Sequence, residues 1–137
     1  MDTKWEQQML KGATIVVVED DPVICDLVTA VFEDVGARCV CFGSADAALA
    51  RLDEPDTSCS LAIVDHGIPG AIRGTELLYR MRDHWPTVPA ILTSGYELDS
   101  PLLPNVVYLQ KPWSMDRLVD TVCMLLKLDR SIEMQQQ

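Results

Sequence analysis

The chain has 137 residues, of which 48% are hydrophobic and 23% charged, as is typical of one globular domain. Its formal charge of −10 argues against direct binding to nucleic acid or to an anionic membrane surface, because both require clustered Lys and Arg. No apolar run approaches the roughly 18 residues of a membrane-spanning helix, and the N-terminus lacks the basic and then apolar layout of a signal peptide.

Five short apolar runs are expected to form strands. They are continuously apolar rather than alternating, which indicates strands that are covered on both faces. The runs are residues 14–18, 37–42, 61–64, 90–93 and 106–109.

The segments between these runs have helical spacing of their apolar residues. Pro22 suits the first turn of a helix that Gly36 ends, and Ser44 is a candidate cap for the next helix. A third helix is expected from about Thr75 to Pro86, and a last one from Ser114. Alternation of strand and helix predicts an α/β fold, a three-layer, doubly wound (βα)5 domain with a parallel sheet.

One connection departs from this alternation. Pro101 and Pro104 lie between the fourth and fifth expected strands and leave room for a helical turn or two, so the fourth helix is expected to be short or absent. The domain is expected over residues 12–130, with an extension at 1–11 and a tail at 131–137.

The five cysteines form no disulfide framework, and their odd number indicates a reducing, cytoplasmic location. Cys39 and Cys41 would share one face of a strand. A metal or redox pair at these two positions stays open, beside the simpler interpretation of small buried apolar residues.

Polar residues follow four of the expected strands. Ligand sites of open parallel sheets form at the carboxyl ends of strands, so these residues are expected to meet at one edge. Carboxylates, a hydroxyl and an ammonium group suit a divalent cation and a phosphoryl group, and a carboxylate can itself accept phosphorus. Asp21 has an alternative role as the cap of the helix that Pro22 begins. The residues are Glu19, Asp20, Asp21, Asp65, Thr93, Ser94 and Lys111.

Four stretches, "VVVEDDPVI", "LAIVDHGIPG", "PAILTSGY" and "YLQKPW", together resemble the receiver domain of two-component response regulators, the group that includes the chemotaxis protein CheY. The resemblance runs from about Thr14 to Leu128. It implies a flavodoxin/CheY-like fold with the sheet order 2-1-3-4-5.

The resemblance also implies a role for each matching residue. Asp65 matches the phospho-acceptor, Ser94 and Lys111 match the residues that contact the phosphoryl group, and Tyr108 matches the aromatic switch. The peptide bond before Pro112 is implied to be cis. Mg²⁺ or Mn²⁺ would be held by Glu19, Asp20, Asp65 and the backbone carbonyl of Gly67. Glu19 departs from the commoner Asp of the family, and its longer side chain is expected to act through water.

The function implied is a phosphoryl-accepting module that switches protein–protein interactions and catalyses only its own phosphorylation and dephosphorylation. Its partners would be a sensor histidine kinase or a histidine phosphotransfer protein and an unknown downstream protein. The chain would act alone or belong to a longer hybrid kinase or regulator. Ile132 prolongs the apolar stripe of the last helix, which favours a dimer contact or a linker.

Two alternatives stay open. A pseudo-receiver would bind its partners without control by phosphorylation. A haloacid-dehalogenase-type phosphohydrolase would need an acid at the position of Gly67, which counts against it.

Overall fold

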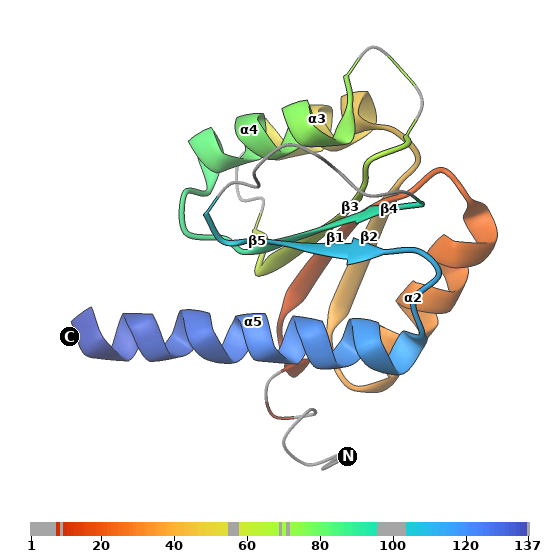
Figure 1. Cartoon of the computed structure of the whole chain (residues 1–137). Coiled ribbons are helices and arrows are strands. Elements are labelled where there is room, and N and C mark those ends of the chain that lie inside the picture. The colour runs from red at the N-terminus through yellow and green to blue at the C-terminus, as the bar shows by residue number, and fades with distance from the viewer. Residues whose placement is uncertain are drawn as a thin grey trace.

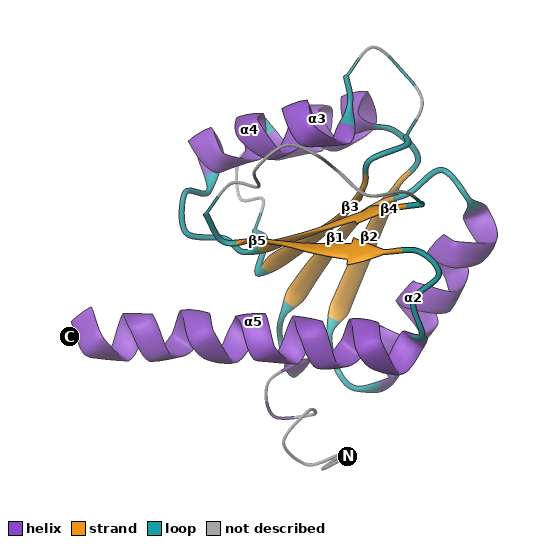
Figure 2. Ribbon diagram, viewed as in Figure 1, coloured by secondary structure: helices purple, strands orange, loops and turns teal. Residues whose placement is uncertain are grey.

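The computed structural model describes residues 8, 10–54, 58–68, 70, 72–95 and 104–136, with side chains up to residue 127. Five parallel strands form one sheet in the order β2-β1-β3-β4-β5, which confirms the order implied by the resemblance (Figure 2). Each strand matches a predicted apolar run to within one residue at either end. They are β1 (Thr14–Val18), β2 (Arg38–Phe42), β3 (Leu61–Asp65), β4 (Ala90–Ser94) and β5 (Val106–Gln110).

Helices cover both faces of the sheet. The helices α2 (Pro22–Asp34) and α5 (Met115–Gln136) lie on one face, and α3 (Ala45–Leu52) and α4 (Gly74–His84) lie on the other (Figure 1). Alternate residues of a strand point to opposite faces, so β1 contributes Ile15 and Val17 to the first core and Val16 and Val18 to the second. Two apolar cores explain why the strand runs are continuously apolar.

Both ends of α2 are closed by local hydrogen bonds. The Asp21 side chain accepts a hydrogen bond from the backbone N–H of Val23 at 2.9 Å, which confirms the capping role of Asp21. At the other end, Gly36 has a φ of +93°, and the N–H of Ala37 donates to the Phe32 carbonyl at 3.1 Å. This is the Schellman arrangement, in which glycine adopts the left-handed conformation at little cost.

The next two helices also begin and end close to their predicted positions. Ser44 Oγ accepts a hydrogen bond from the Ala47 N–H at 3.2 Å, so Ser44 caps α3 as predicted. Helix α4 begins at Gly74, one residue before the predicted Thr75, and ends two residues before Pro86. Proline ends the helix because it restricts the residue before it and lacks an N–H donor.

The last helix begins at Met115, one residue after the predicted Ser114. Ser114 Oγ accepts a hydrogen bond from the Arg117 N–H at 3.1 Å, where α5 begins. The helical backbone continues to Gln136, past the expected end of the domain at residue 130, and extends beyond the sheet (Figure 1). The Ile132 side chain lies outside the described part, so a dimer contact through it stays a prediction.

The fourth crossover joins Ser94 of β4 to Val106 of β5. Its residues 96–103 lie outside the described part, and with them the expectation of a short or absent fourth helix. The described residues of this connection, 95, 104 and 105, are not helical.

Candidate functional site

The polar residues of the predicted site lie at the carboxyl ends of four strands. Glu19 follows β1, Asp65 and Ser94 are the last residues of β3 and β4, and Lys111 follows β5. The backbone N–H of Lys111 donates to the Ser94 carbonyl at 2.7 Å, which continues the ladder between β4 and β5. Glu19, Asp65 and Ser94 are buried, with 6%, 7% and 2% of their surface exposed, whereas Asp20 is exposed.

Lys111 is paired with both buried acids. Its Nζ donates to Asp65 Oδ2 at 3.2 Å and to Glu19 Oε2 at 3.5 Å. The other oxygen of each carboxylate is held by backbone: Asp65 Oδ1 accepts from the Gly67 N–H at 3.1 Å, and Glu19 Oε1 from the Asp21 N–H at 3.2 Å. Residues far apart in the sequence thus form one network at this edge.

One ammonium group does not compensate fully for the buried acids. Burial, a hydrogen bond with Asp65 and repulsion by Asp65 raise the pKa of Glu19 to about 7, although Lys111 acts in the opposite direction. Burial lowers the pKa of Lys111, but attraction by Glu19 and Asp65 outweighs it, so that the net pKa is raised. The site therefore favours an added cation, which would allow Glu19 to ionise.

The donor set fits a hard divalent cation. One carboxylate oxygen from each of Glu19, Asp20 and Asp65 lies within 4.8 Å of the others. Opposite oxygens around Mg²⁺ are about 4.2 Å apart, twice a Mg–O distance of about 2.1 Å, so a small approach or a bridging water would suffice. The Gly67 backbone contacts Asp65 Oδ1 through its N–H, and its carbonyl stays a predicted ligand.

The structure also places the remaining predicted residues. Tyr108 lies in β5 opposite Leu92 of β4, two residues before Ser94, and is half-buried. The peptide bond between Lys111 and Pro112 is cis, which confirms the geometry implied by the resemblance.

Sequence reasoning missed two residues that position the Asp65 segment. A Cβ added at Gly74 would lie 2.8 Å from the Asp65 carbonyl oxygen and 2.9 Å from His66 Cα, so α4 begins in direct contact with the end of β3. Thr75 Oγ1 lies 3.2 Å from His66 Nδ1. The sequence did show a glycine beside the predicted start of this helix. That a glycine is required there follows only from the close contact between α4 and the end of β3.

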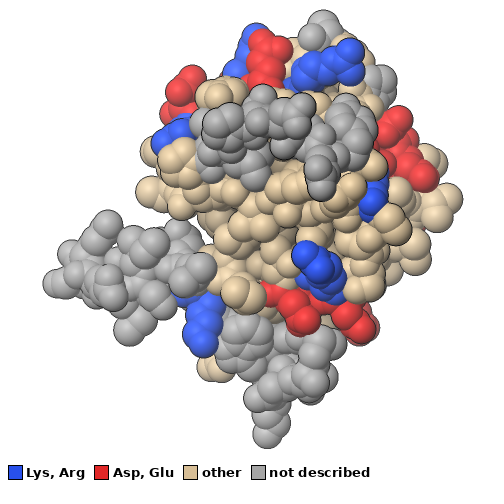
Figure 3. Space-filling view, in the orientation of Figure 1, with Lys and Arg blue, Asp and Glu red and all other residues tan. Residues whose placement is uncertain are grey.

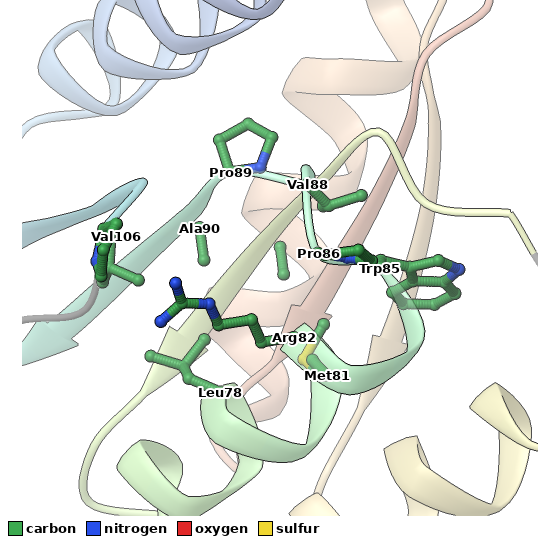
Figure 4. A pocket seen from close by; sticks show the side chains of 11 residues that line it. Leu78, Met81, Arg82, Trp85, Pro86, Val88, Pro89, Ala90 and Val106 are labelled. Carbon is green, nitrogen blue, oxygen red and sulfur yellow. The ribbon is translucent and has the colours of Figure 1, made fainter.

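Of the hollows among the described residues, one adjoins the site and another lies at the far ends of two strands. An apolar groove between α2 and the start of α5 includes Lys111 in its wall. A smaller pocket of about 20 Å³, room for about one water molecule, lies at the opposite ends of β4 and β5, where Figure 4 shows Ala90 and Val106. The groove is lined by Ile24, Leu27, Val31, Lys111, Pro112, Trp113 and Met115.

A doubly wound parallel sheet with buried acids and a lysine at its carboxyl edge defines an α/β protein of the flavodoxin/CheY-like class. Residues 15–123 match the family model described as "Response regulator receiver domain". The chain therefore belongs to the family of response regulator receiver domains, which are modules of two-component signalling rather than conventional enzymes. No helix among the described residues is long and apolar enough to span a membrane.

The chain is similar to both isolated and larger regulators. It is 33% identical over 118 residues to the hydrogenase transcriptional regulatory protein HoxA of Cupriavidus necator. This match covers 82% of the chain but only 24% of HoxA. It matches NtrX of Brucella abortus with a TM-score of 0.72 and 26% identity, covering 89% of this chain and 29% of NtrX. A receiver protein from Sinorhizobium medicae shares the fold, with a TM-score of 0.79, 20% identity and coverage of 86% and 97%.

Proposed function

We propose that this chain is a phosphorylation-controlled receiver in which Asp65 accepts a phosphoryl group in the presence of Mg²⁺. The main support is the contact of Asp65 with Lys111 at 3.2 Å, beside the carboxylates of Glu19 and Asp20. This arrangement combines a nucleophile, a cationic partner for phosphoryl oxygens and oxygen ligands for a metal. Membership of the receiver family supports the same function.

The chemistry at Asp65 is an in-line transfer. An Asp65 carboxylate oxygen attacks phosphorus, a P–O bond forms, and the P–N bond of a phosphohistidine donor breaks. Mg²⁺, held by Glu19, Asp20, Asp65 and the Gly67 carbonyl, would neutralise charge on the phosphoryl oxygens. Lys111 already lies beside Asp65 and would pair with the transferred group.

The output is a shift between two conformations. The new group adds about −1.5 to −2 charges, by analogy with other phosphorylated side chains. Ser94 would donate its hydroxyl to this group, and Tyr108, two positions behind Ser94 in the strand pairing, would change its rotamer. The two conformations are both populated before phosphorylation, and the added charge favours the active one.

The groove beside Lys111 is the proposed contact for the phosphodonor protein, a histidine kinase or phosphotransfer protein. Leu27 lines the groove and is 55% exposed, and Val23 on the same helix is 64% exposed. Large exposed apolar side chains next to a reactive group are typical of a protein contact. On the face shown in Figure 3, Lys and Arg are interspersed with Asp and Glu, which does not suggest a nucleic-acid surface.

The phosphodonor contact is tested separately from the chemistry. The change Leu27→Asp should slow transfer from a phosphorylated histidine protein at least several-fold and leave labelling by a small acyl phosphate unchanged. Met124→Asp, at another exposed apolar residue, is the control. Equal slowing by both changes would remove the groove from the proposal.

The central experiment is incubation with acetyl phosphate and Mg²⁺, followed by intact-mass measurement. One phosphate per chain is expected in the wild type, with none in Asp65→Asn or after removal of Mg²⁺ by a chelator. No adduct on the wild type would favour a pseudo-receiver. Repeated turnover of a phosphoester would favour a phosphohydrolase, and an adduct on Asp65→Asn would place the acceptor elsewhere.

A further inference from the structure

Three of the cysteines converge where α2 packs against β2. Cys25 belongs to α2, whereas Cys39 and Cys41 lie two residues apart on β2 and therefore share a face of the sheet. All three side chains are half-buried. Thr29 Oγ1 lies 3.2 Å from Cys41 Sγ and 3.6 Å from Cys39 Sγ, and Cys25 adjoins these two thiols through its carbonyl oxygen, which Cys41 Sγ contacts. These side chains form a cluster between the two elements.

Cys41 is at the centre of this thiol cluster. Its Sγ lies 3.8 Å from the Cys25 carbonyl oxygen and 3.2 Å from Thr29 Oγ1. Hydrogen bonding with Cys39, supported by Thr29 and Cys25 against the effect of burial, lowers the pKa of Cys41 to about 6. The thiolate is the reactive form of a cysteine, so Cys41 is the candidate nucleophile of the cluster.

Strand geometry decides which cysteine can pair with Cys41. A strand rises about 3.3 Å per residue, so the Cβ atoms of Cys39 and Cys41 are about 6.6 Å apart, whereas a disulfide needs about 3.5–4.5 Å. Both residues are also held in register with β1, opposite Ile15 and Val17. A bond between them would distort the strand. Cys25 approaches from a different element and is free of this constraint.

We propose that Cys25 and Cys41 are a redox-active pair, which a peroxide converts into an intramolecular disulfide between α2 and β2. The Cys41 thiolate attacks one peroxide oxygen: an S–O bond forms, the O–O bond breaks, and hydroxide leaves. The Cys25 sulfur then loses its proton and attacks the Cys41 sulfenic acid. The S–S bond forms, the S–O bond breaks, and the hydroxyl group leaves with that proton as water.

This pair lies directly behind the acidic edge of the sheet. Cys25 Sγ donates a hydrogen bond to the Glu19 carbonyl oxygen at 3.2 Å, and a disulfide removes this donor. The pair does not depend on phosphorylation of Asp65, so it would stand even if the proposed function failed.

The test uses the full chain, reduced and then exposed to hydrogen peroxide, with remaining thiols blocked by N-ethylmaleimide. Peptide mapping without reduction should find the Cys25–Cys41 cross-link within monomeric chains. Cys25→Ser and Cys41→Ser should lose it completely. Cys39→Ser, which keeps a hydroxyl donor beside Cys41, and Cys59→Ser, a half-buried thiol on the other side of the sheet, should retain it.

A dimedone adduct on Cys41 in the Cys25→Ser variant would support the order of steps. The proposal is overturned if the wild-type cross-link joins Cys39 to Cys41, if it joins two chains, or if Cys41 is oxidised to a sulfinic acid with no disulfide. These outcomes are all read on the wild-type protein, so they do not depend on whether a variant folds.

Discussion

The core beneath α2 and α5 and the acidic edge of the same sheet both bury side chains, with opposite consequences. Phe32 and Leu118 are fully buried against other apolar residues, so their burial removes apolar surface from water. Glu19 and Asp65 are almost as buried, but each carries a carboxyl group beside the other. The core stabilises the fold, whereas the edge is expected to lower the stability of the metal-free protein and holds Asp65, the proposed phospho-acceptor.

Removing a core side chain should have the largest effect. Phe32→Ala is expected to lower the free energy of unfolding by about 3–5 kcal/mol, because it removes buried surface and leaves a cavity. Tyr79→Ala, at an aromatic residue that is 55% exposed, is the matched control and should change stability by about 0.5 kcal/mol or less. Urea denaturation measures both, and an equal loss for the two variants would contradict the comparison.

The contact between α4 and the end of β3 should be the next most sensitive. Gly74→Ala brings a methyl group against the backbone of Asp65 and His66, with an expected cost of about 1–3 kcal/mol despite the better helix propensity of alanine. Gly43→Ala is the control, since an added Cβ there meets nothing within 4 Å. Stability is read by denaturation, and a stabilised Gly74→Ala variant would show that the contact relaxes freely.

The acidic edge should make the stability of the metal-free protein depend on pH. The folded-state pKa of Glu19, about 7, exceeds the ordinary value of 4.5, so the folded chain binds this proton more tightly than the unfolded chain. The stabilisation that protonated Glu19 gives the folded chain is fully present below pH 4.5 and is lost as the pH rises through about 7.

Glu19→Gln is expected to remove this pH dependence and to raise stability at pH 8 by about 1–3 kcal/mol in the presence of a chelator. Glu33→Gln, at an exposed glutamate of α2, is the control and should keep the wild-type slope. Denaturation midpoints at pH 5 and pH 8 measure the effect. A wild-type slope in Glu19→Gln would assign the pH dependence to another group.

The smallest expected effect separates Asp21 from the acids beside it. Asp21→Ala should cost about 1 kcal/mol of stability, because the Val23 N–H loses its cap, while Mg²⁺ affinity stays unchanged. Asp20→Asn should show the reverse, with weaker Mg²⁺ binding and little change in stability. Binding titrations and denaturation on both variants measure these effects. Weaker Mg²⁺ binding by Asp21→Ala would show that Asp21 also contributes to the metal site.

Local patterns were sufficient for much of the fold. Strand limits followed from apolar runs, and the caps at Asp21 and Ser44 and the stop at Gly36 followed from residue types whose effect is confined to one turn. The rule that parallel strands present their carboxyl ends at one edge then brought Glu19 and Asp65 together. Family resemblance added the sheet order and the cis peptide bond.

The sequence by itself thus determined the five strands, the starts of the described helices and the set of residues at the carboxyl edge, because these depend on short-range geometry and on a general rule of parallel sheets. Only the tertiary structure decided the 3.2 Å contact of Lys111 with Asp65, the approach of Gly74 to β3 and the contact of Cys41 Sγ with the Cys25 backbone. Each joins elements that are separate in the chain, and their distance is set by how side chains of the whole domain pack.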